Sequence, residues 1–126
     1  MEKIITISKK DFKIKSSAFT PFAYKNETGR DLIKDINKIN KLNNEISEIA
    51  DEKEKNERWL DEITGILELV LKMAFIMIKE ADKTISNYDD WLKGLDDVMS
   101  DTKWLNEVME VGLAPLSGQL QGNQNK

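Results

Sequence analysis

The sequence contains neither cysteine nor histidine among its 126 residues. Without them the chain has no disulfide bond, no thiol nucleophile and no imidazole base. The same absences remove the ligands on which zinc and most transition-metal sites depend. The six glycines stand singly, so no phosphate-binding loop, nucleophile elbow or dinucleotide fingerprint is present. We therefore expect a protein that is not an enzyme and that uses no metal or cofactor.

Acidic side chains are the remaining candidates for a catalytic or calcium-binding site. Two pairs have the side chains for acid–base work, namely Asp89 with Asp90 and Asp96 with Asp97. Both pairs occupy predicted helix starts or turns, where acids are expected for structural reasons. The stretch that begins at Asp82 lacks the glycine that a calcium loop requires at its sixth position. Neither pattern predicts a catalytic or calcium site.

The chain also lacks a hydrophobic run long enough to cross a membrane. Its most apolar stretch, residues 63–78, contains Glu68 and Lys72 and is shorter than the roughly 18 to 20 apolar residues that a span needs. The start, MEKIITISKKDF, has no apolar signal-peptide core and no small-residue cleavage site. We therefore expect no membrane association and a cytoplasmic location.

Length and composition indicate one domain, and its charges are distributed unevenly along the chain. At 40% hydrophobic and 33% charged residues, the chain suits a single core over residues 1–116, followed by a disordered polar tail over residues 117–126. Residues 1–30 have seven basic and three acidic side chains, whereas residues 80–112 have nine acidic side chains and three lysines. Opposite charges at two ends can steer head-to-tail contacts in a homo-oligomer, and the alternative is two ordinary solvated faces. The residues predicted to associate are Lys9, Lys10, Lys13, Asp89, Asp90, Asp96 and Asp97.

The N-terminal segment predicts a β-hairpin over residues 3–16. Residues 3–8 are rich in β-branched side chains, and in the next run Phe12 and Ile14 alternate with lysines. A lone hairpin is marginal in water, so the Phe12/Ile14 face should pack on helices. The lysines on the other face keep the hairpin soluble or bind an acidic partner. A nucleic-acid site would also need interleaved aromatics or arginines, so we expect no nucleic-acid partner.

Two helices are expected after the hairpin. The first covers residues 21–28, with Phe22 and Tyr24 in the core. Thr20 is its expected N-cap, Pro21 its first helical residue and Gly29 its left-handed stop. Asp31 caps the second, whose apolar residues recur at spacings of three and four: Leu32, Ile36, Ile39, Leu42, Ile46 and Ile49. The polar run DEKEKNE, residues 51–57, is either a loop or an exposed helical stretch, and we favour a break before the next helix.

A central helix is predicted from near Arg58 to Ala81, and the other elements should pack around it. Its polar positions form one thin line, consisting of Asp61, Gly65, Glu68, Lys72 and Lys79. Phe75 and Ile76 flank this line and are expected to present apolar surface to a partner helix, together with Lys72 and Lys79. The alternative for Phe75 and Ile76 is a place in the core.

Two shorter helices complete the expected fold. Ser86 or Asn87 caps an acidic helix that turns Trp91, Leu92 and Leu95 inward. Ser100 or Asp101 starts the last helix, which ends at Gly112 because Pro115 prevents its continuation; its buried residues are Trp104, Leu105, Val108 and Met109. The expected fold class is mainly α, with a short N-terminal hairpin packed on a bundle of about five helices around the central apolar helix.

Four segments follow one another in an informative order: FKIKSSA, TPFAYKNETGRDLIKDI, KMAFIMIKEAD and YDDWLKGL. Their order and spacing resemble those of the tail assembly chaperones of long-tailed phages that infect Gram-positive bacteria. Where members of that family have an aromatic residue before the glycine of the second segment, this chain has Thr28. The positions that match the family pattern include Thr20, Pro21, Tyr24, Gly29, Arg30, Asp31, Trp91 and Leu92.

The resemblance implies a non-catalytic protein of the host cytoplasm, absent from the mature virion. Such a chaperone coats the helical tape-measure protein and shields its apolar stripes before the tail tube forms around it. In this family a ribosomal frameshift often appends a domain that recruits the tail-tube protein, and this chain would be the short form. Two alternatives remain open: a structural head-tail or tail-completion protein, and a nucleic-acid-binding regulator that uses the basic hairpin.

Overall fold

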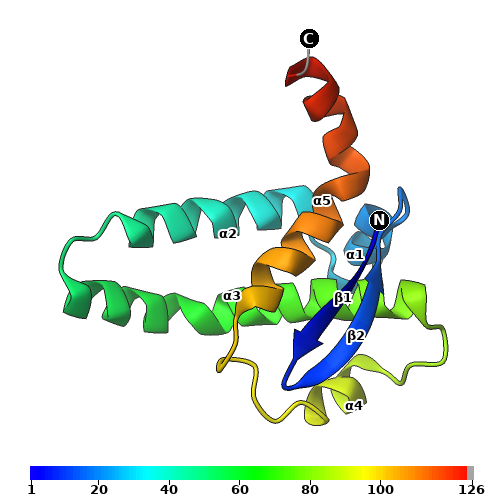
Figure 1. The fold of residues 1–126 in the computed structure, drawn as a ribbon, viewed down its shortest axis with the longest axis horizontal. Helices are drawn as coiled ribbons and strands as arrows, with labels where there is room; N and C mark the ends of the chain where they lie inside the picture. The colour runs from blue at the N-terminus through cyan, green and yellow to red at the C-terminus, as the bar shows by residue number, and fades with distance from the viewer. Residues whose placement is uncertain (125–126) are drawn as a thin grey trace.

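The structure, a computed structural model, describes residues 1–124, with side-chain surroundings for residues 1–116. The described chain forms one two-stranded antiparallel sheet and five helices. In chain order they are β1 (Glu2–Ile7), β2 (Lys10–Lys15), α1 (Thr20–Thr28), α2 (Leu32–Ser47), α3 (Glu52–Ala81), α4 (Tyr88–Lys93) and α5 (Lys103–Gln124) (Figure 1). This arrangement confirms the predicted fold class, a hairpin packed on helices around a central one.

The hairpin covers the helices with its apolar face, as the alternation of its sequence predicts. Ile5 lies opposite Phe12 in the register of the two strands. The inward side chains, which are buried or packed against the core, are Ile5, Ile7, Phe12 and Ile14. Ser8 and Lys9 form the turn with φ values of 55° and 63°. Two successive positive φ values are those of a type I′ turn, whose twist suits a hairpin.

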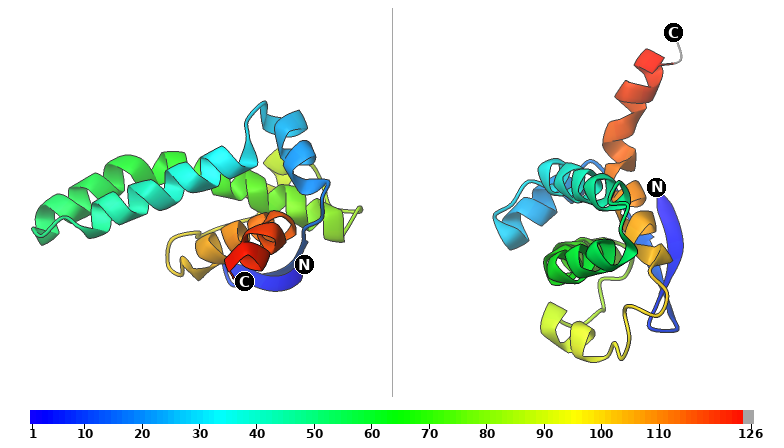
Figure 2. Two further views of the ribbon diagram at one scale, coloured as in Figure 1. Left: turned by 90° about the horizontal axis from the view of Figure 1, so that it is seen from above. Right: turned by 90° about the vertical axis from the view of Figure 1, so that its left-hand side faces the viewer.

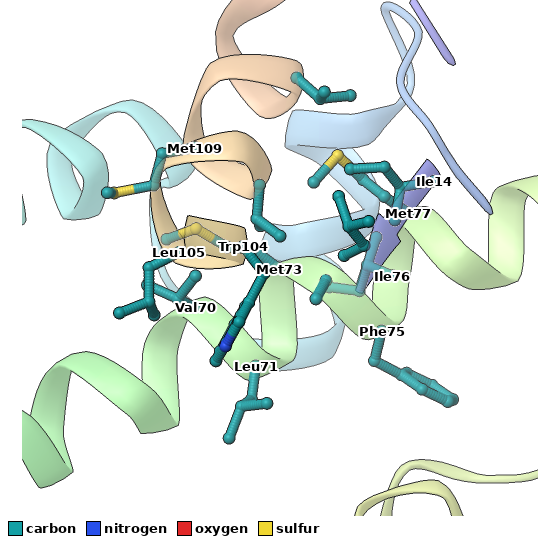
Figure 3. Packing of buried hydrophobic residues seen from close by; sticks show 14 of the residues in the cluster. Ile14, Val70, Leu71, Met73, Phe75, Ile76, Met77, Trp104, Leu105 and Met109 are labelled. Carbon is teal, nitrogen blue, oxygen red and sulfur yellow. The ribbon is translucent and has the colours of Figure 1, made fainter. Parts of the chain in front are cut away.

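The second half of α3 forms the centre of the core. Every residue from Met73 to Ile78 is buried, because the hairpin, α1 and α5 all pack against this part of the helix. Figure 3 shows Met73 and Met77 directed toward α5, and Phe75 directed away from it. Trp104 of α5 is fully buried, and its Nε1 donates to the carbonyl of Val98 at 3.1 Å. The apolar side chains of this half of the helix are thus buried, while Glu68 and Lys79 stay exposed.

The first half of α3 has a different environment. Together with the end of α2 it forms a two-helix arm, residues 42–63, which extends away from the other elements (Figures 1 and 2). Ile46 and Ile63 are buried in the arm but lie outside the main core cluster, and Leu60 is 67% exposed. Arg58 pairs with Glu45 across the two helices at 3.8 Å. The arm is therefore joined by a narrow apolar seam.

The favoured break at residues 51–57 is wrong and the alternative, an exposed helical stretch, is confirmed, because α3 begins at Glu52. Asp51 is the N-cap, and its carboxylate accepts a hydrogen bond from the backbone N–H of Glu54 at 3.4 Å. Glu52 and Glu54 in the first turn suit the positive end of the helix dipole. A wholly polar run remains helical here because it forms an exposed, capped end. The predicted end of the helix at Ala81 is confirmed.

The predicted end of the last helix at Gly112 is also wrong, because α5 continues to Gln124 with Pro115 inside it. Proline lacks the N–H of a helical bond, but its fixed φ is that of a helix, so the chain can continue beyond it. A Cβ at Gly112 would meet Ile36 Cδ1 at 3.7 Å, so the glycine lies close to α2 without clashing. The disordered tail expected over residues 117–126 stays a prediction; α5 extends to residue 124, and residues 125–126 lie outside the described part of the chain.

Candidate functional site

Two phenylalanines at the start of α1 are unusually exposed. Phe19 is 58% and Phe22 65% exposed, whereas Tyr24 on the same helix is fully buried. The expectation that Phe22 belongs to the core is therefore wrong; that helix is short and turns Tyr24 inward. Spacings of three and four on a helix place Phe22 beside both Phe19 and Asn26. Exposed aromatic side chains that gather in this way indicate a contact surface.

A groove runs next to these phenylalanines, between α1 and the second half of α3. It encloses about 230 Å³ and is lined by Phe19, Ala23 and Asn26 on the α1 side. Phe75 and Ile76 line it on the α3 side, and Lys79 and Lys83 stand at the same side. We call this feature the α1–α3 groove. It combines an apolar lining with charged side chains at the rim, which suits an amphipathic partner.

The two apolar residues predicted to face a partner are less accessible than expected. Phe75 is 5% and Ile76 6% exposed, so the expectation that they present apolar surface is wrong, and the core alternative is confirmed. The ring of Phe75 packs against Tyr88 and Trp91 of α4, with a centroid separation of 5.6 Å in each pair. Both residues nevertheless line the α1–α3 groove, whose exposed aromatic rim is supplied by α1.

The two predicted lysines have different environments. Lys79 is exposed and lines the α1–α3 groove, as a partner contact requires. Lys72 is half-buried, and its Nζ lies 3.9 Å from the ring centroid of Tyr88. This cation–π contact holds α4 against α3 within one protomer. The structure therefore brings Lys79, Phe75 and Ile76 together and separates Lys72 from them.

A carboxylate at the end of α3 fixes the position of α1. Glu80 accepts hydrogen bonds from Ser17 Oγ at 2.7 Å and from Thr20 Oγ1 at 2.8 Å. Thr20 is buried and is the first residue of α1, with Phe19 as N-cap, so its predicted role as N-cap is wrong. Its hydroxyl instead accepts from the Ser17 backbone N–H at 2.9 Å. These bonds hold one wall of the groove against the other.

A hydrogen-bonded cluster of Tyr24, Arg30 and Asp35 joins α1 to α2. Tyr24 Oη donates to Asp35 Oδ2 at 2.7 Å, and Arg30 donates to both carboxylate oxygens at 2.8 Å. Burial acts to raise the pKa of Asp35, but the hydrogen bonds from Arg30 and Tyr24 outweigh it and leave this pKa lowered. Burial, and then the bond to Asp35, raise the pKa of Tyr24. The side chain of Arg30 is 47% exposed, so the pair is open to solvent on one side.

Most positions that match the family pattern have a structural role. Gly29 closes α1 with a φ of 71°, and Asp31 caps α2 by accepting from the Lys34 N–H at 3.0 Å, as predicted. Pro21 lies in the first turn of α1, which suits its missing N–H. Trp91 is buried in the aromatic cluster of α4, and Leu92 packs against the core. These residues position the groove without lining it.

Sequence reasoning missed Asp35 and Glu80. A signal for Asp35 was present, because it stands between Leu32 and Ile36 on the apolar face of its helix and follows Arg30 closely. A charged residue at a core position indicates a buried partner. The partners of Glu80 are 60 and 63 positions away in the chain, so no local pattern could have indicated them.

Some of the residues predicted to drive self-association, those of the hairpin turn and of the acidic loop, lie close together in one protomer. Lys10 Nζ donates to the Gly94 carbonyl at 2.6 Å, and Ser8 Oγ accepts from the backbone N–H groups of Asp96 and Asp97. The pKa of Asp97 is lowered first by the Ser100 hydroxyl, then by backbone N–H groups and finally by Lys9. The expectation of two oppositely charged ends is therefore wrong, because the hairpin turn rests on the acidic loop.

The remaining charges predicted for self-association are exposed. Lys13 pairs with Glu2 on the outer face of the hairpin at 3.3 Å. Asp89 and Asp90 stand at the start of α4, where Asn87 is the N-cap, as predicted. These groups have ordinary local roles and do not supply a complementary pair of surfaces.

A second, larger groove lies between α2, α3 and α5. It encloses about 670 Å³ and has Trp59, Ile66 and Met109 among its apolar residues. Its polar residues include Asn40, Asn43, Asn44 and Asn106, and none of its lining residues is charged. We call this feature the neutral groove.

No protein-family model, curated protein or solved structure matches this chain. Within residues 1–124, no helix is long and apolar enough to cross a membrane. In the same part of the chain, no three acidic side chains are placed to hold a metal ion. The geometry of the grooves and the resemblance in the sequence are therefore the basis for a functional proposal.

Proposed function

We propose that this protein is a phage tail assembly chaperone that binds a helical segment of the tape-measure protein in the α1–α3 groove. It acts without catalysis, by shielding apolar stripes of the tape-measure protein until the tail tube forms around it. One observation supports this site above all: Phe19 is 58% exposed and lines the same groove as Phe75 and Ile76, and Phe22, one turn further along α1, is 65% exposed.

The chemistry of the groove suits an amphipathic helix. Its apolar lining can accept side chains spaced three and four residues apart, as in other helix-in-groove complexes. Lys79, Glu80 and Lys83 line the groove beside α3, where the carboxylate of Glu80 already accepts two hydrogen bonds, and Glu27 lines it on α1. This asymmetry favours a partner helix with acidic residues along one edge, which would fix its orientation. Fixed hydrogen bonds from Ser17 and Thr20 to Glu80 preorganise the groove for binding.

The wider biological role follows from the sequence resemblance. We propose that the chaperone works in the cytoplasm of the bacterial host and is absent from the mature virion. A frameshifted longer form would recruit the tail-tube protein to the coated tape measure. Mass spectrometry of purified particles separates this role from that of a head-tail or tail-completion protein, because only the latter is retained in the virion.

Co-expression with the tape-measure protein of the same phage tests the binding site. We expect the wild-type chain to co-purify with the tape-measure protein and to raise its soluble fraction. The double substitution Phe19→Ser with Phe22→Ser should abolish most of both effects, because exposed aromatic anchors dominate interface energetics.

A matched control separates the groove from general surface hydrophobicity. Ile4 is 66% and Leu60 67% exposed, close to the values of the two phenylalanines, but they lie on β1 and on the arm. The substitution Ile4→Ser with Leu60→Ser should therefore leave co-purification unchanged. No co-purification of the wild type would reject the function, and equal losses in both double variants would reject the groove as its site.

A further inference from the structure

The α1–α3 groove continues beyond the end of α1. A second hollow of about 440 Å³ lies between α1, α3 and α4, and Glu27 lines both hollows. On the α3 side the second hollow is lined by Lys72, one turn before Phe75. Figures 1 and 2 show the second half of α3 between α1 and α4. The two hollows therefore form one continuous site, which we call the extended groove.

One face of α3 forms the floor of the extended groove. The α3 residues that line it recur at helical spacing: Lys72, Phe75, Ile76, Lys79, Glu80 and Lys83. At a rise of about 1.5 Å per residue, this floor is about 16 Å long, or about three helical turns. The wall formed by α1 runs in the opposite direction, because Thr20 bonds to Glu80 whereas Glu27 lies with Lys72. The site is therefore long enough for a partner helix of about three turns.

The end of the extended groove at the C-terminus of α3 is basic. Lys79 and Lys83 are exposed there, and neither forms an ion pair within residues 1–116. The carboxylate of Glu80 lies beside them but already accepts hydrogen bonds from Ser17 and Thr20. This end therefore favours acidic side chains of a partner.

The opposite end of the extended groove has an excess of acid. Its charged lining residues are three acids and two lysines: Glu27, Asp89, Asp90, Lys72 and Lys93. The Nζ of Lys72 lies over the ring of Tyr88, and Asp90 accepts a hydrogen bond from the Asn87 side chain. Glu27 and Asp89 stay exposed and outnumber the exposed Lys93. This end therefore favours basic side chains of a partner.

The middle of the extended groove is mainly apolar. Phe19 and Ala23 line it from α1, and Phe75 and Ile76 line it from α3. Apolar side chains at spacings of three and four on a partner helix can pack there. We propose that the partner is an amphipathic helix of about three turns, with acidic side chains at one end of its apolar stripe and basic side chains at the other. This inference rests on the function proposed above, because it specifies the partner of the same site.

Two labelled peptides of identical composition test this charge order by fluorescence anisotropy with the full-length chain. Both have leucines at spacings of three and four and no net charge. The bipolar peptide has glutamates in its first turn and lysines in its last, whereas the mixed peptide has equal numbers of both at each end. We expect the bipolar peptide to bind about tenfold or more tightly at low salt, and the difference to shrink as salt screens the charges.

Charge reversal at the basic end separates the groove from the properties of the peptides themselves. Lys79→Glu with Lys83→Glu should remove the preference for the bipolar peptide, because both ends of the extended groove are then acidic. The control Lys34→Glu with Lys41→Glu makes the same change in charge at exposed positions of α2 outside the groove and should retain the preference.

Reversal of both ends gives the sharpest result. Adding Glu27→Lys and Asp89→Lys to the groove variant should restore the preference, because the bipolar peptide can then lie in the opposite direction. A loss of folding could not produce this recovery. Equal binding of the two peptides by the wild type, or no binding of either, would overturn the inference, as would a preference that the groove variant retains. Failure of the tape-measure protein to co-purify would instead reject the proposed function, while order-dependent peptide binding would still support the extended groove.

Discussion

The two halves of α3 show how one helix can serve two different structures. From Met73 to Ile78 every residue is buried, because the hairpin, α1, α4 and α5 surround this half. In the arm only Ile63 reaches a buried state on the α3 side, and the facing helix contributes Ile46. Burial on all sides needs a second layer of elements, and that layer covers only half of the helix. The second half of α3 and the elements that surround it, which we call the body, therefore provide a rigid wall for the α1–α3 groove, while the arm depends on a narrow seam.

The difference in packing between the body and the arm should show most strongly when a large side chain is removed from each of them. Trp104→Ala should lower the free energy of unfolding by about 3–5 kcal/mol, because it leaves a cavity at the centre of the body. Ile63→Ala in the arm should cost about 2 kcal/mol, the low end for such a truncation, because the site is at the edge of the core. Urea denaturation of both variants checks these values, and equal losses would contradict a body that is more tightly packed than the arm.

The ion pair of Arg30 with Asp35 predicts that the free energy of unfolding depends on pH through a group of the body. The pKa of Asp35 is lowered in the folded state. Its stabilisation is therefore complete above the ordinary aspartate pKa of about 4 and is lost as the pH falls through the lower folded-state pKa. Asp35→Asn should cost about 1–2 kcal/mol at neutral pH, because Arg30 loses a bidentate charged partner.

Urea denaturation of the wild type and Asp35→Asn across the acid range checks this prediction. The difference between the two proteins should shrink as the pH falls through the folded-state pKa of Asp35. Ion pairs of the arm, such as Arg58 with Glu45, are exposed. Glu45→Gln should therefore leave the dependence of the free energy of unfolding on pH nearly unchanged in the acid range. A constant difference at all pH values would contradict the role given to the Asp35 carboxylate.

The smallest expected effect lies at the boundary between the two halves. Gly65 is exposed inside α3, and a Cβ built there meets no atom within 4 Å. Gly65→Ala should therefore raise the free energy of unfolding by about 0.5–1 kcal/mol, because glycine disfavours a helix interior. Thermal denaturation monitored by circular dichroism checks this gain. A loss of stability would show that the boundary needs a flexible residue.

The parts of the fold that could be predicted from the sequence depend on local patterns. Alternating side chains indicated the inward face of the hairpin, and three-four spacing indicated the buried face of α5. The caps at Gly29, Asp31 and Asn87 followed from their side chains or backbone freedom alone. Each of these features is decided by residues within one or two turns, so a single sequence contains the necessary information.

The errors arose where distant segments decide the outcome. Phe22 is an aromatic residue of the kind that usually lies in a core. The contacts of Glu80 and Tyr24, however, hold α1 in an orientation that exposes Phe22. Pro115 normally ends a helix, yet here α5 continues beyond it. The grooves could not be predicted for the same reason, since each is formed by residues from two or three elements.

Hydrogen–deuterium exchange on the complex with the tape-measure protein tests the central claim most directly. The account predicts that binding slows exchange in α1 and in the end of α3, residues 19–28 and 75–83, where the α1–α3 groove lies. Exchange in the arm, residues 42–63, should stay unchanged. Protection confined to the arm or to the outer face of the hairpin, with none at the α1–α3 groove, would contradict it.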